Sequence, residues 1–341
     1  MPTAHAHRPP PRAALAMSEE TATAVFGPAA REELAAVCDL APPVLDDLTT
    51  DRARAVLART ELLVTGWGCP PVDEAALAAA PRLRAIAHSG GSVRAHVTEA
   101  CWERGIEVSS AAAANALPVA EYTVAMILLS GKRVLERARD HRASRERGHP
   151  LRVDRALGNY GRTVGICSAS LIGRRVIELL RPYDLRVLLH DPYVTDDEAA
   201  ALGVRKVGIE ELFAASDVVS VHTPLLPATR GLVGRELLAA LRPGATLINT
   251  ARGAVVDQEA LTEAALAGRL HAVLDVTDPE GLPPDHPLWD CENVLLTPHL
   301  AGSQGNEWRR LAELTVSEVA RWAAGDGFAH PVRRERLGYL A

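Results

Sequence analysis

The sequence has no surplus of positive charge: among its 341 residues, 43 acidic side chains outnumber 37 basic ones, and the net charge is −6. A surface that binds nucleic acid or anionic lipid needs a concentrated positive field, so this balance argues against both kinds of partner. The 25 glycines follow no fixed period and the 23 prolines are scattered, which excludes a collagen-like chain. Hydrophobic residues make up 48% of the chain, too many for an intrinsically disordered protein.

The five cysteines lack any pairing pattern. None belongs to a CxxC pair, and their odd number leaves at least one thiol unpaired, so we expect reduced, mostly buried thiols and a cytoplasmic protein. No apolar segment of a signal peptide occurs near the N-terminus, and residues 1–12 are predicted to be a disordered tail. The longest fully apolar stretch, 124–129, is far shorter than the roughly 20 residues of a membrane span, so no membrane partner is expected.

Several catalytic signatures are missing as well. No set of His, Cys and Asp residues has the spacing of metal ligands, so no metal site is predicted. Neither a GxSxG nucleophile elbow nor a Walker phosphate-binding loop occurs. The remaining class is a two-lobed globular protein, because a single core stops growing at about 250–300 residues.

The chain does contain a regular alternation of short apolar runs and amphipathic helical stretches. This alternation predicts an α/β fold with two Rossmann-like lobes, each built on a doubly wound parallel sheet. Strands of the first lobe are expected at 61–64, 84–87 and 106–109, and those of the second at 163–167, 186–189, 217–221, 245–248, 272–276 and 294–296.

Two helices define how the lobes are connected. One long helix is predicted from Pro118 to Ala143, apolar in its first half and basic in its second, and it is a candidate dimer-forming element. A second helix, 307–323, is expected to return to the first lobe. The predicted domains are therefore a discontinuous substrate-binding lobe, residues 13–117 with 303–341, and a dinucleotide-binding lobe, residues 118–302.

A dinucleotide fingerprint is expected at the first strand–helix turn of the second lobe. In place of GxGxxG the chain reads SASLIG over 168–173, which keeps only the third glycine, Gly173. That glycine allows close packing of helix on strand, whereas the first two allow a tight turn and a close approach to pyrophosphate. Asp191 ends the next strand, where a carboxylate accepts hydrogen bonds from the adenosine ribose and repels a 2′-phosphate. The alternative is that Asp191 merely begins an Asp-Pro turn.

Three further polar residues follow later strands of the same lobe. Arg252 lies between Ala251 and a glycine, which suits bidentate capture of a carboxylate better than packing. Glu280 and His299 follow the next two strands, and a carboxylate beside a histidine fixes the tautomer of a proton donor. Taken singly, Glu280 could be a solvated loop charge and His299 part of a capped turn. Of the other histidines, His88, His222 and His286 are predicted to lie near the cleft, and the rest to be structural or exposed.

Four stretches resemble the NAD-dependent D-2-hydroxyacid dehydrogenases, a family that includes phosphoglycerate dehydrogenase and glyoxylate/hydroxypyruvate reductase. They are 115–121, 247–253, 274–288 and 295–299, and the resemblance covers about residues 83–324. It implies an oxidoreductase that transfers a hydride between NAD(H) and a small 2-hydroxy or 2-keto acid, and a homodimer.

The resemblance also implies roles for individual residues. His299 would be the proton donor, Glu280 its partner, and Arg252 the anchor of the substrate carboxylate and carbonyl, with Gly90 and Gly91 holding the carboxylate from the first lobe. The implied cofactor ligands are Ser170, Leu171, Ile172 and Gly173 at the pyrophosphate, Asp191 at the ribose, Thr223, Pro224 and Thr229 at the middle of the dinucleotide, and Thr250, Ala251 and Asp275 at the nicotinamide.

The sequence departs from the family pattern in its cofactor loop. Ser168 and Ser170 replace two glycines, Leu171 stands where the family has a polar residue, and Gly281 replaces a proline after Glu280. These departures leave a second hypothesis open, a non-catalytic protein that senses NAD(H) or binds a partner on the same fold. The identity of the 2-keto acid is also left open, because substrate choice depends on first-lobe loops that depart from the common pattern.

Overall fold

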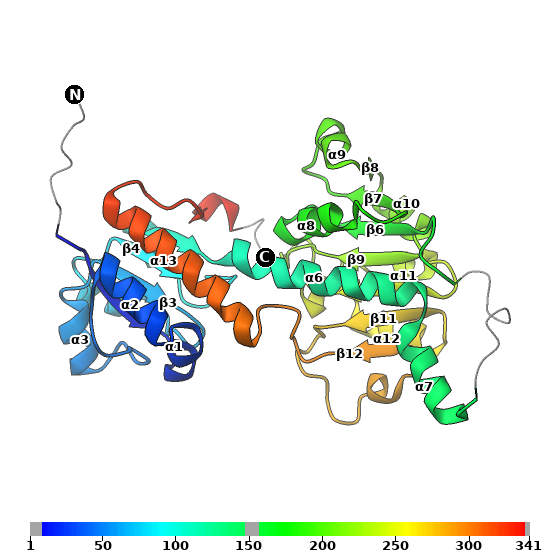
Figure 1. Ribbon diagram of the computed structural model, residues 1–341, viewed down its shortest axis with the longest axis horizontal. Helices are drawn as coiled ribbons and strands as arrows, with labels where there is room; N and C mark the ends of the chain where they lie inside the picture. The colour runs from blue at the N-terminus through cyan, green and yellow to red at the C-terminus, as the bar shows by residue number, and fades with distance from the viewer. Residues whose placement is uncertain (1–8, 147–156, 338–341) are drawn as a thin grey trace. The chain divides into compact units, whose positions relative to one another are not determined.

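The computed structural model describes residues 9–146 and 157–337 (Figure 1). Within these residues the chain up to Asn115, together with the segment from Ser303 onward, forms a first compact unit, and Ala116–Gly302 forms a second. Each unit contains one sheet.

The first unit is built on a sheet with the strand order β13-β5-β4-β3-β1-β2, parallel except where β13 pairs with β5. Its strands are β1 (Arg12–Ala16), β2 (Asp39–Leu40), β3 (Leu62–Thr65), β4 (Ala85–His88), β5 (Glu107–Ser110) and β13 (Pro331–Val332). Its helices are α1 (Glu19–Val25), α2 (Pro28–Val37), α3 (Asp51–Leu57), α4 (Glu74–Ala79), α5 (Glu99–Glu103) and α13 (Trp308–Ala324).

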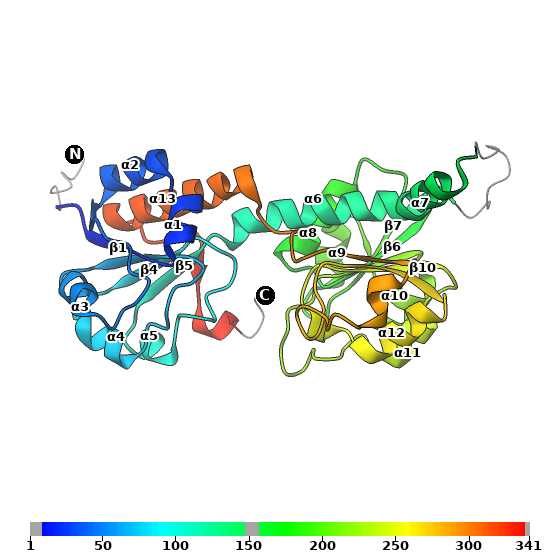
Figure 2. The same ribbon diagram turned by 90° about the horizontal axis from the view of Figure 1, so that it is seen from below.

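Helices cover both faces of this sheet (Figure 2). Successive strand residues point to opposite faces, so Leu62 and Val64 of β3 pack under α1, α2 and α13, while Leu63 packs under α3, α4 and α5. Burial on both faces explains why the strands are continuous apolar runs rather than alternating ones. Leu311 and Val319 of α13 pack in the same core as Leu62 and Val64 of β3. This unit is therefore assembled from two separated segments of the chain.

The second unit contains a fully parallel seven-stranded sheet with the order β12-β11-β10-β9-β6-β7-β8. Its strands are β6 (Thr163–Cys167), β7 (Arg186–His190), β8 (Arg205–Lys206), β9 (Val218–Val221), β10 (Ala245–Asn249), β11 (Leu270–Leu274) and β12 (Val294–Leu296). Its helices include α8 (Leu171–Leu180), α9 (Asp196–Leu202), α10 (Ile209–Ala215), α11 (Arg235–Ala240) and α12 (Gln258–Leu266). The two parallel, doubly wound sheets confirm the predicted α/β fold class.

The long helix predicted from Pro118 to Ala143 is wrong at its start and in its continuity, although its predicted end lies one residue from the end of the helical region. Helix α6 begins at Ala112 and ends at Gly131, with Pro118 inside it, and a separate helix α7 runs over Val134–Ser144. At this end the side-chain amide of Asn159 donates to the carbonyl of Leu128 in the last turn of α6, at 3.0 Å. Gly131 leaves room for that side chain, since a Cβ there would lie 1.7 Å from Oδ1 of Asn159. Arg133 then takes a left-handed conformation with φ of 49°, which no helix can continue.

Helix α6 is long and apolar enough to cross a membrane, judged by its 20 residues and composition alone. The uninterrupted apolar stretch 124–129 is much shorter than this helix, because Glu121, Tyr122 and Thr123 precede it. The structure provides another reason for the composition, since Ala120, Val124 and Ile127 are buried in the core beneath β6 and β10. A buried core helix passes the same test, so the finding is weak support for a membrane span.

The N-terminal tail predicted for residues 1–12 ends before Arg12. The first eight residues lie outside the described part of the chain, but Arg12 opens β1, and its guanidinium lies 3.0 Å from the carboxylate of Asp39. Strand β1 pairs with β3 on one side and with β2 on the other, so it is an interior strand of the sheet.

Candidate functional site

The three residues predicted to be catalytic all follow the carboxyl ends of neighbouring strands. In the sheet register, Asn249 of β10 lies opposite Leu274 of β11, which lies opposite Leu296 of β12. Arg252, Glu280 and His299 come three to six residues after these three strand ends. In open parallel sheets this edge is where ligands bind.

The structure brings His299 and Glu280 into direct contact. Nδ1 of the imidazole pairs with Oε1 of Glu280, and both side chains are exposed, by 46% and 68% respectively. The backbone of His299 is left-handed, with φ of 52°, and its amide donates to the carbonyls of Thr297 and Asp275, both at 3.0 Å. Because Nδ1 is paired with Glu280, Nε2 is the ring nitrogen that can form a hydrogen bond with a substrate.

Asp275 holds the loop that carries His299. Its carboxylate is 2% exposed; Oδ1 accepts from Thr297 Oγ1 at 2.6 Å and from the Leu300 amide at 2.8 Å, while Oδ2 accepts from the Ala301 amide at 3.0 Å. The donors therefore come from both sides of His299. A buried carboxylate with several donors defines a loop conformation more tightly than neutral hydrogen bonds do.

Thr297 extends this network to helix α6. Its hydroxyl lies 3.0 Å from the hydroxyl of Tyr122, and on the next residue of the helix the Thr123 hydroxyl lies 3.3 Å from that of Thr250. Burial raises the pKa of Tyr122, which keeps the phenol in its neutral form. Sequence reasoning missed Tyr122 and Thr297 as site-supporting residues; the position of Thr297 two residues before His299 was the available signal.

Arg252 is oriented by the turn that follows β10. The side chain of Asn249 bridges this turn, donating to the Arg252 carbonyl and accepting from the Ala251 amide, each at 3.0 Å. A Cβ on Gly253 would lie 2.0 Å from the backbone carbonyl of Thr277. This close approach brings the Arg252 turn against the loop that leads to Glu280, so the glycine is needed for packing rather than for flexibility.

The strand–helix turn at Ser168 has the geometry of a nucleotide loop despite its missing glycines. Ser168 has φ of 81°, the conformation that a glycine would take most easily. Ser170 is the N-cap of α8, and its hydroxyl accepts from the Gly173 amide at 3.3 Å. A Cβ on Gly173 would lie 2.1 Å from the Ser168 carbonyl oxygen. The remaining glycine is thus the one that close packing of α8 on β6 requires.

Asp191 turns its carboxylate into this loop. It follows β7, is 7% exposed, and accepts three hydrogen bonds: from the Ala169 amide at 2.8 Å and the Ser168 hydroxyl at 3.2 Å on Oδ2, and from the Tyr193 amide at 2.8 Å on Oδ1. The sequence indicated its place at the strand end but not these internal partners. The helix N-terminus, the retained glycine and the carboxylate together fit a dinucleotide.

The other predicted cofactor residues lie along the same edge of the sheet. Leu171 is 51% exposed at the first turn of α8, and Ile172 beside it is half-buried. Thr223 follows β9 and is buried against Cys167, while the Thr229 hydroxyl closes a turn by donating to the carbonyl of Pro224. Thr250 and Ala251 are buried directly after β10.

The predicted substrate ligands Gly90 and Gly91 belong to the first unit, directly after β4. A Cβ on Gly90 would lie 2.7 Å from Nε2 of His88, which is itself buried. Their role as carboxylate ligands stays a prediction.

Two histidines expected near a cleft are instead buried. His88 shares the Thr65 hydroxyl with His96, at 3.0 and 2.9 Å, and His222 lies 2.9 Å from the Ser220 hydroxyl. Burial, reinforced by the neighbouring His96, lowers the pKa of His88 to about 3, and burial alone lowers the pKa of His222 to about 3. Both are neutral core residues, because the low-dielectric interior disfavours the imidazolium. His286 caps a short 3-10 helix, Pro287–Asp290, and accepts from the Leu288 amide.

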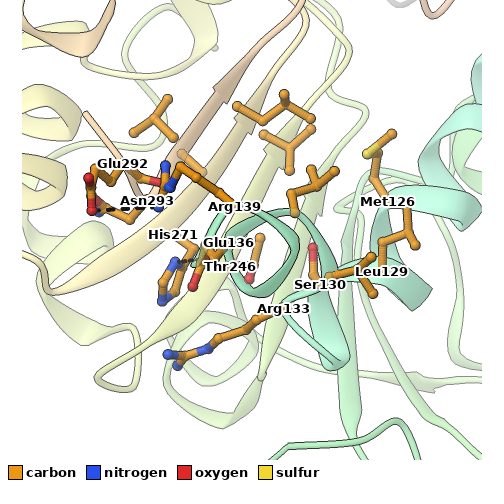
Figure 3. Close-up of a pocket in the computed structure, with 16 residues that line it drawn as sticks. Met126, Leu129, Ser130, Arg133, Glu136, Arg139, Thr246, His271, Glu292 and Asn293 are labelled. Atoms are coloured by element: carbon orange, nitrogen blue, oxygen red, sulfur yellow. Dashed lines mark hydrogen bonds and ion pairs between the residues drawn. The ribbon is translucent and has the colours of Figure 1, made fainter. Parts of the chain in front are cut away.

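A cavity of about 150 Å³ lies at the opposite ends of the strands from Arg252, Glu280 and His299 (Figure 3). Helices α6 and α7 form one wall, and the other includes Thr246 and His271 from the amino-terminal halves of β10 and β11. His271 Nδ1 lies 2.6 Å from Glu136 Oε1 across this cavity. None of the predicted site residues lines it. Over residues 9–146 and 157–337, no cluster of three His, Cys, Asp or Glu side chains is placed to hold a metal ion.

Comparison with known proteins identifies the family. The family model described as D-isomer specific 2-hydroxyacid dehydrogenase, NAD binding domain, matches residues 124–301. A glyoxylate reductase from Korarchaeum cryptofilum is 35% identical over 262 residues, which cover 75% of this chain and 78% of the relative. The chain belongs to the D-isomer-specific 2-hydroxyacid dehydrogenases.

Two further relatives support this conclusion. A D-3-phosphoglycerate dehydrogenase from Mycobacterium leprae is 34% identical over 260 residues, covering 75% of this chain, but the match spans only about half, 48%, of the relative. The crystal structure of D-lactate dehydrogenase from Aquifex aeolicus, complexed with NAD and lactic acid, superimposes with a TM-score of 0.70 at 27% identity, covering 92% of this chain and 96% of that chain. These findings confirm the predicted family, the NAD cofactor and an oxidoreductase acting on the CH–OH group of a 2-hydroxy acid.

Proposed function

We propose that this dehydrogenase reduces a small 2-keto acid with Arg252, Glu280 and His299 as its catalytic residues and with Gly90 and Gly91 as ligands of the substrate carboxylate. The observation that carries the proposal is the direct pairing of His299 with Glu280, on strand ends adjacent to the one that leads to Arg252. A histidine whose Nδ1 is held by a carboxylate presents Nε2 in a defined tautomer and orientation.

Each catalytic residue has a role that follows from its chemistry. NADH, when bound, supplies the hydride that reduces the carbonyl carbon. His299 holds a proton at Nε2 and delivers it to the carbonyl oxygen, on which negative charge develops, and Glu280 keeps the Nδ1 hydrogen in place. Arg252 offers a fixed fork of donors for the substrate carboxylate and carbonyl, and stabilises the developing charge electrostatically.

The cofactor residues divide according to the part of the dinucleotide they would hold. We infer that the N-terminal turn of α8 (Ser170, Leu171, Ile172, Gly173) receives the pyrophosphate, and that Asp191 receives the adenosine ribose. Thr223, Pro224 and Thr229 would contact the middle of the dinucleotide, and Thr250 and Ala251 the nicotinamide side. Asp275 supports this site chiefly through the His299 loop, since both its carboxylate oxygens already accept hydrogen bonds from Thr297, Leu300 and Ala301.

For the substrate, we propose an acid of the glyoxylate or hydroxypyruvate class. The most extensive support is the 35% identity to a glyoxylate reductase, which holds over most of both chains, whereas the match to phosphoglycerate dehydrogenases covers about half of those proteins. Turnover of glyoxylate, hydroxypyruvate and phosphohydroxypyruvate at equal concentration distinguishes the possibilities. A kcat/KM that is highest for phosphohydroxypyruvate would contradict the proposed class.

The test of the catalytic assignment replaces His299 by alanine. NADH oxidation is expected to fall at least about 100-fold, because general acid catalysis contributes roughly 10²–10⁴-fold, while NADH binding measured by calorimetry stays near the wild-type value. His330→Ala is the matched control, since His330 is an exposed histidine of the first unit. Undiminished turnover in His299→Ala would refute the assignment.

We further propose a homodimer in which helix α7 takes part. None of its 11 residues is buried within the chain, and Val134 and Leu135 are exposed, so α7 offers apolar side chains to a second copy. Beside these side chains Arg139 and Glu292 form an ion pair at 3.6 Å, so this surface carries no excess charge of one sign that would repel a second copy. Leu135→Glu is expected to shift sedimentation from dimer to monomer, whereas Leu266→Glu, an exposed leucine on α12, leaves it unchanged. A monomeric wild type would contradict the proposal.

We also propose that the protein is located in the cytoplasm. Its support is that all five cysteines are free thiols, with Cys38, Cys101 and Cys167 buried, as is usual in a reducing environment.

A further inference from the structure

Ser168 occupies a backbone conformation that serine rarely takes. Its φ is 81°, and it is one of four non-glycine residues with positive φ within the described parts of the chain. It directly follows β6, and its amide donates to the His190 carbonyl at 2.8 Å, so the strand pairing holds it in place. A side chain at this point is strained, because the Cβ approaches the carbonyl oxygen in the left-handed region.

The hydroxyl of Ser168 is a third donor to Asp191. Two backbone amides already orient this carboxylate: Ala169 donates to Oδ2 and Tyr193 to Oδ1, each at 2.8 Å. The Ser168 hydroxyl donates to the same Oδ2 at a longer 3.2 Å. A glycine at position 168 would leave both amide bonds intact, so the hydroxyl is not needed to direct Asp191 toward the loop.

We propose that Ser168 determines the affinity of this chain for NAD(H), because its hydroxyl competes with the adenosine ribose hydroxyls for the Asp191 carboxylate. The inference rests on the proposed role of Asp191 as the ribose acceptor. A carboxylate has about four acceptor positions, and three of those on Asp191 are filled by protein donors. One position, on Oδ1, is left for the two ribose hydroxyls, so binding both requires sharing or displacing the weakest of the three donors, which by distance is Ser168.

The opposite effect would follow if Ser168 helped to orient Asp191. Removal of its hydroxyl would then loosen the carboxylate and weaken cofactor binding. The two shorter amide bonds argue against this, and the two ideas predict changes of opposite sign, so a single variant separates them.

The experiment is calorimetric titration of NADH into wild type, Ser168→Ala and Ser168→Gly, with thermal unfolding of the same proteins without cofactor. Ser168→Ala removes the hydroxyl but keeps a Cβ at positive φ, and it is expected to bind NADH about 3- to 10-fold more tightly. Ser168→Gly should bind at least as tightly, and its apo form should melt about 2–4 °C above that of Ser168→Ala, since it also relieves the backbone strain.

Arg145→Gly is the matched control for strain. Arg145 has φ of 55° at the end of α7, outside the cofactor loop, so its replacement should raise the melting temperature without changing the affinity for NADH.

Three results would overturn the proposal or its basis. Unchanged or weaker NADH binding by Ser168→Ala refutes competition, and tighter binding by Ser168→Gly alone assigns the effect to backbone strain instead. If folded wild type and both variants all fail to bind NADH, then the proposed cofactor site itself is wrong, which is a separate failure.

Discussion

Thr297 offers the sharpest test of how the loop carrying His299 is held. Replacing it with valine keeps the shape of the side chain and removes one hydroxyl. That hydroxyl donates to the buried Asp275 carboxylate at 2.6 Å and lies 3.0 Å from the Tyr122 hydroxyl. The loop would otherwise stay in place, because the amides of Leu300 and Ala301 still donate to Asp275.

The size of the effect follows from the charge of the acceptor. A hydrogen bond to a charged group contributes about 1.5–3 kcal/mol, against about 0.5–1.5 kcal/mol for a neutral one. Tyr122 is only half-buried, so its hydroxyl can turn to water and adds little. We therefore expect Thr297→Val to lower the free energy of unfolding by about 2 kcal/mol, within the range for a charged acceptor.

The matched control is Thr262→Val. The Thr262 hydroxyl donates at 2.7 Å to the carbonyl of Gln258 one turn earlier in α12, a neutral acceptor that already belongs to a helix. Its loss should cost well under 1 kcal/mol, because threonine bonds of this kind contribute little to helix stability. The difference between the two variants isolates the bond to the carboxylate.

Two measurements check the prediction. Urea unfolding followed by circular dichroism gives the change in stability, and hydrogen exchange should show faster exchange of the Leu300 and Ala301 amides in Thr297→Val. If Thr297→Val differs from Thr262→Val by less than about 0.5 kcal/mol, which is the usual limit of additivity, and the loop amides exchange at wild-type rates, then Asp275 does not hold the His299 loop as argued.

Three further predictions concern packing, acid stability and cofactor choice. Gly253→Ala should destabilise by more than about 2 kcal/mol, because its Cβ would lie 2.0 Å from the Thr277 backbone; Gly234→Ala, whose Cβ would meet nothing nearer than 3.5 Å, should cost far less in the same urea titration. His222, whose pKa burial lowers to about 3, binds a proton when unfolded below about pH 6.5 but not when folded. Its contribution to stability is therefore complete above pH 6.5 and is lost progressively toward pH 3, about 2 kcal/mol of it by pH 5. His222→Gln should accordingly lose less stability than wild type between pH 7.5 and pH 5, and equal losses would contradict a neutral buried imidazole. Asp191→Ala should narrow the preference for NADH over NADPH in calorimetric titration by about tenfold or more, since it removes repulsion of a 2′-phosphate; an unchanged ratio would contradict the ribose assignment.

Local sequence patterns were sufficient to predict the bounds of those elements whose structure depends on their own residues alone. Strand β6 and helix α8 were predicted with the observed bounds, 163–167 and 171–180, because a buried apolar run meets a strongly one-sided helical pattern at a serine cap. The prediction of one continuous helix over 118–143 was wrong because the end of α6 involves contacts with residues far away in the sequence. The last turn of α6, which ends at Gly131, is hydrogen-bonded by the side chain of Asn159 at the Leu128 carbonyl, 31 positions away, and no local pattern displays such a contact.

The sequence by itself determined the alternation of strands and helices, and the appearance of an arginine, a glutamate and a histidine after successive strands of one sheet. These features arise from the period of apolar residues and from residue type, both of which are local. Only the tertiary structure decided that Nδ1 is the atom through which His299 pairs with Glu280, that His222 lies buried and neutral, and that the Asp191 carboxylate already holds three donors. Distances between side chains on different strands depend on how the sheet brings those strands together, and that is a property of the folded chain.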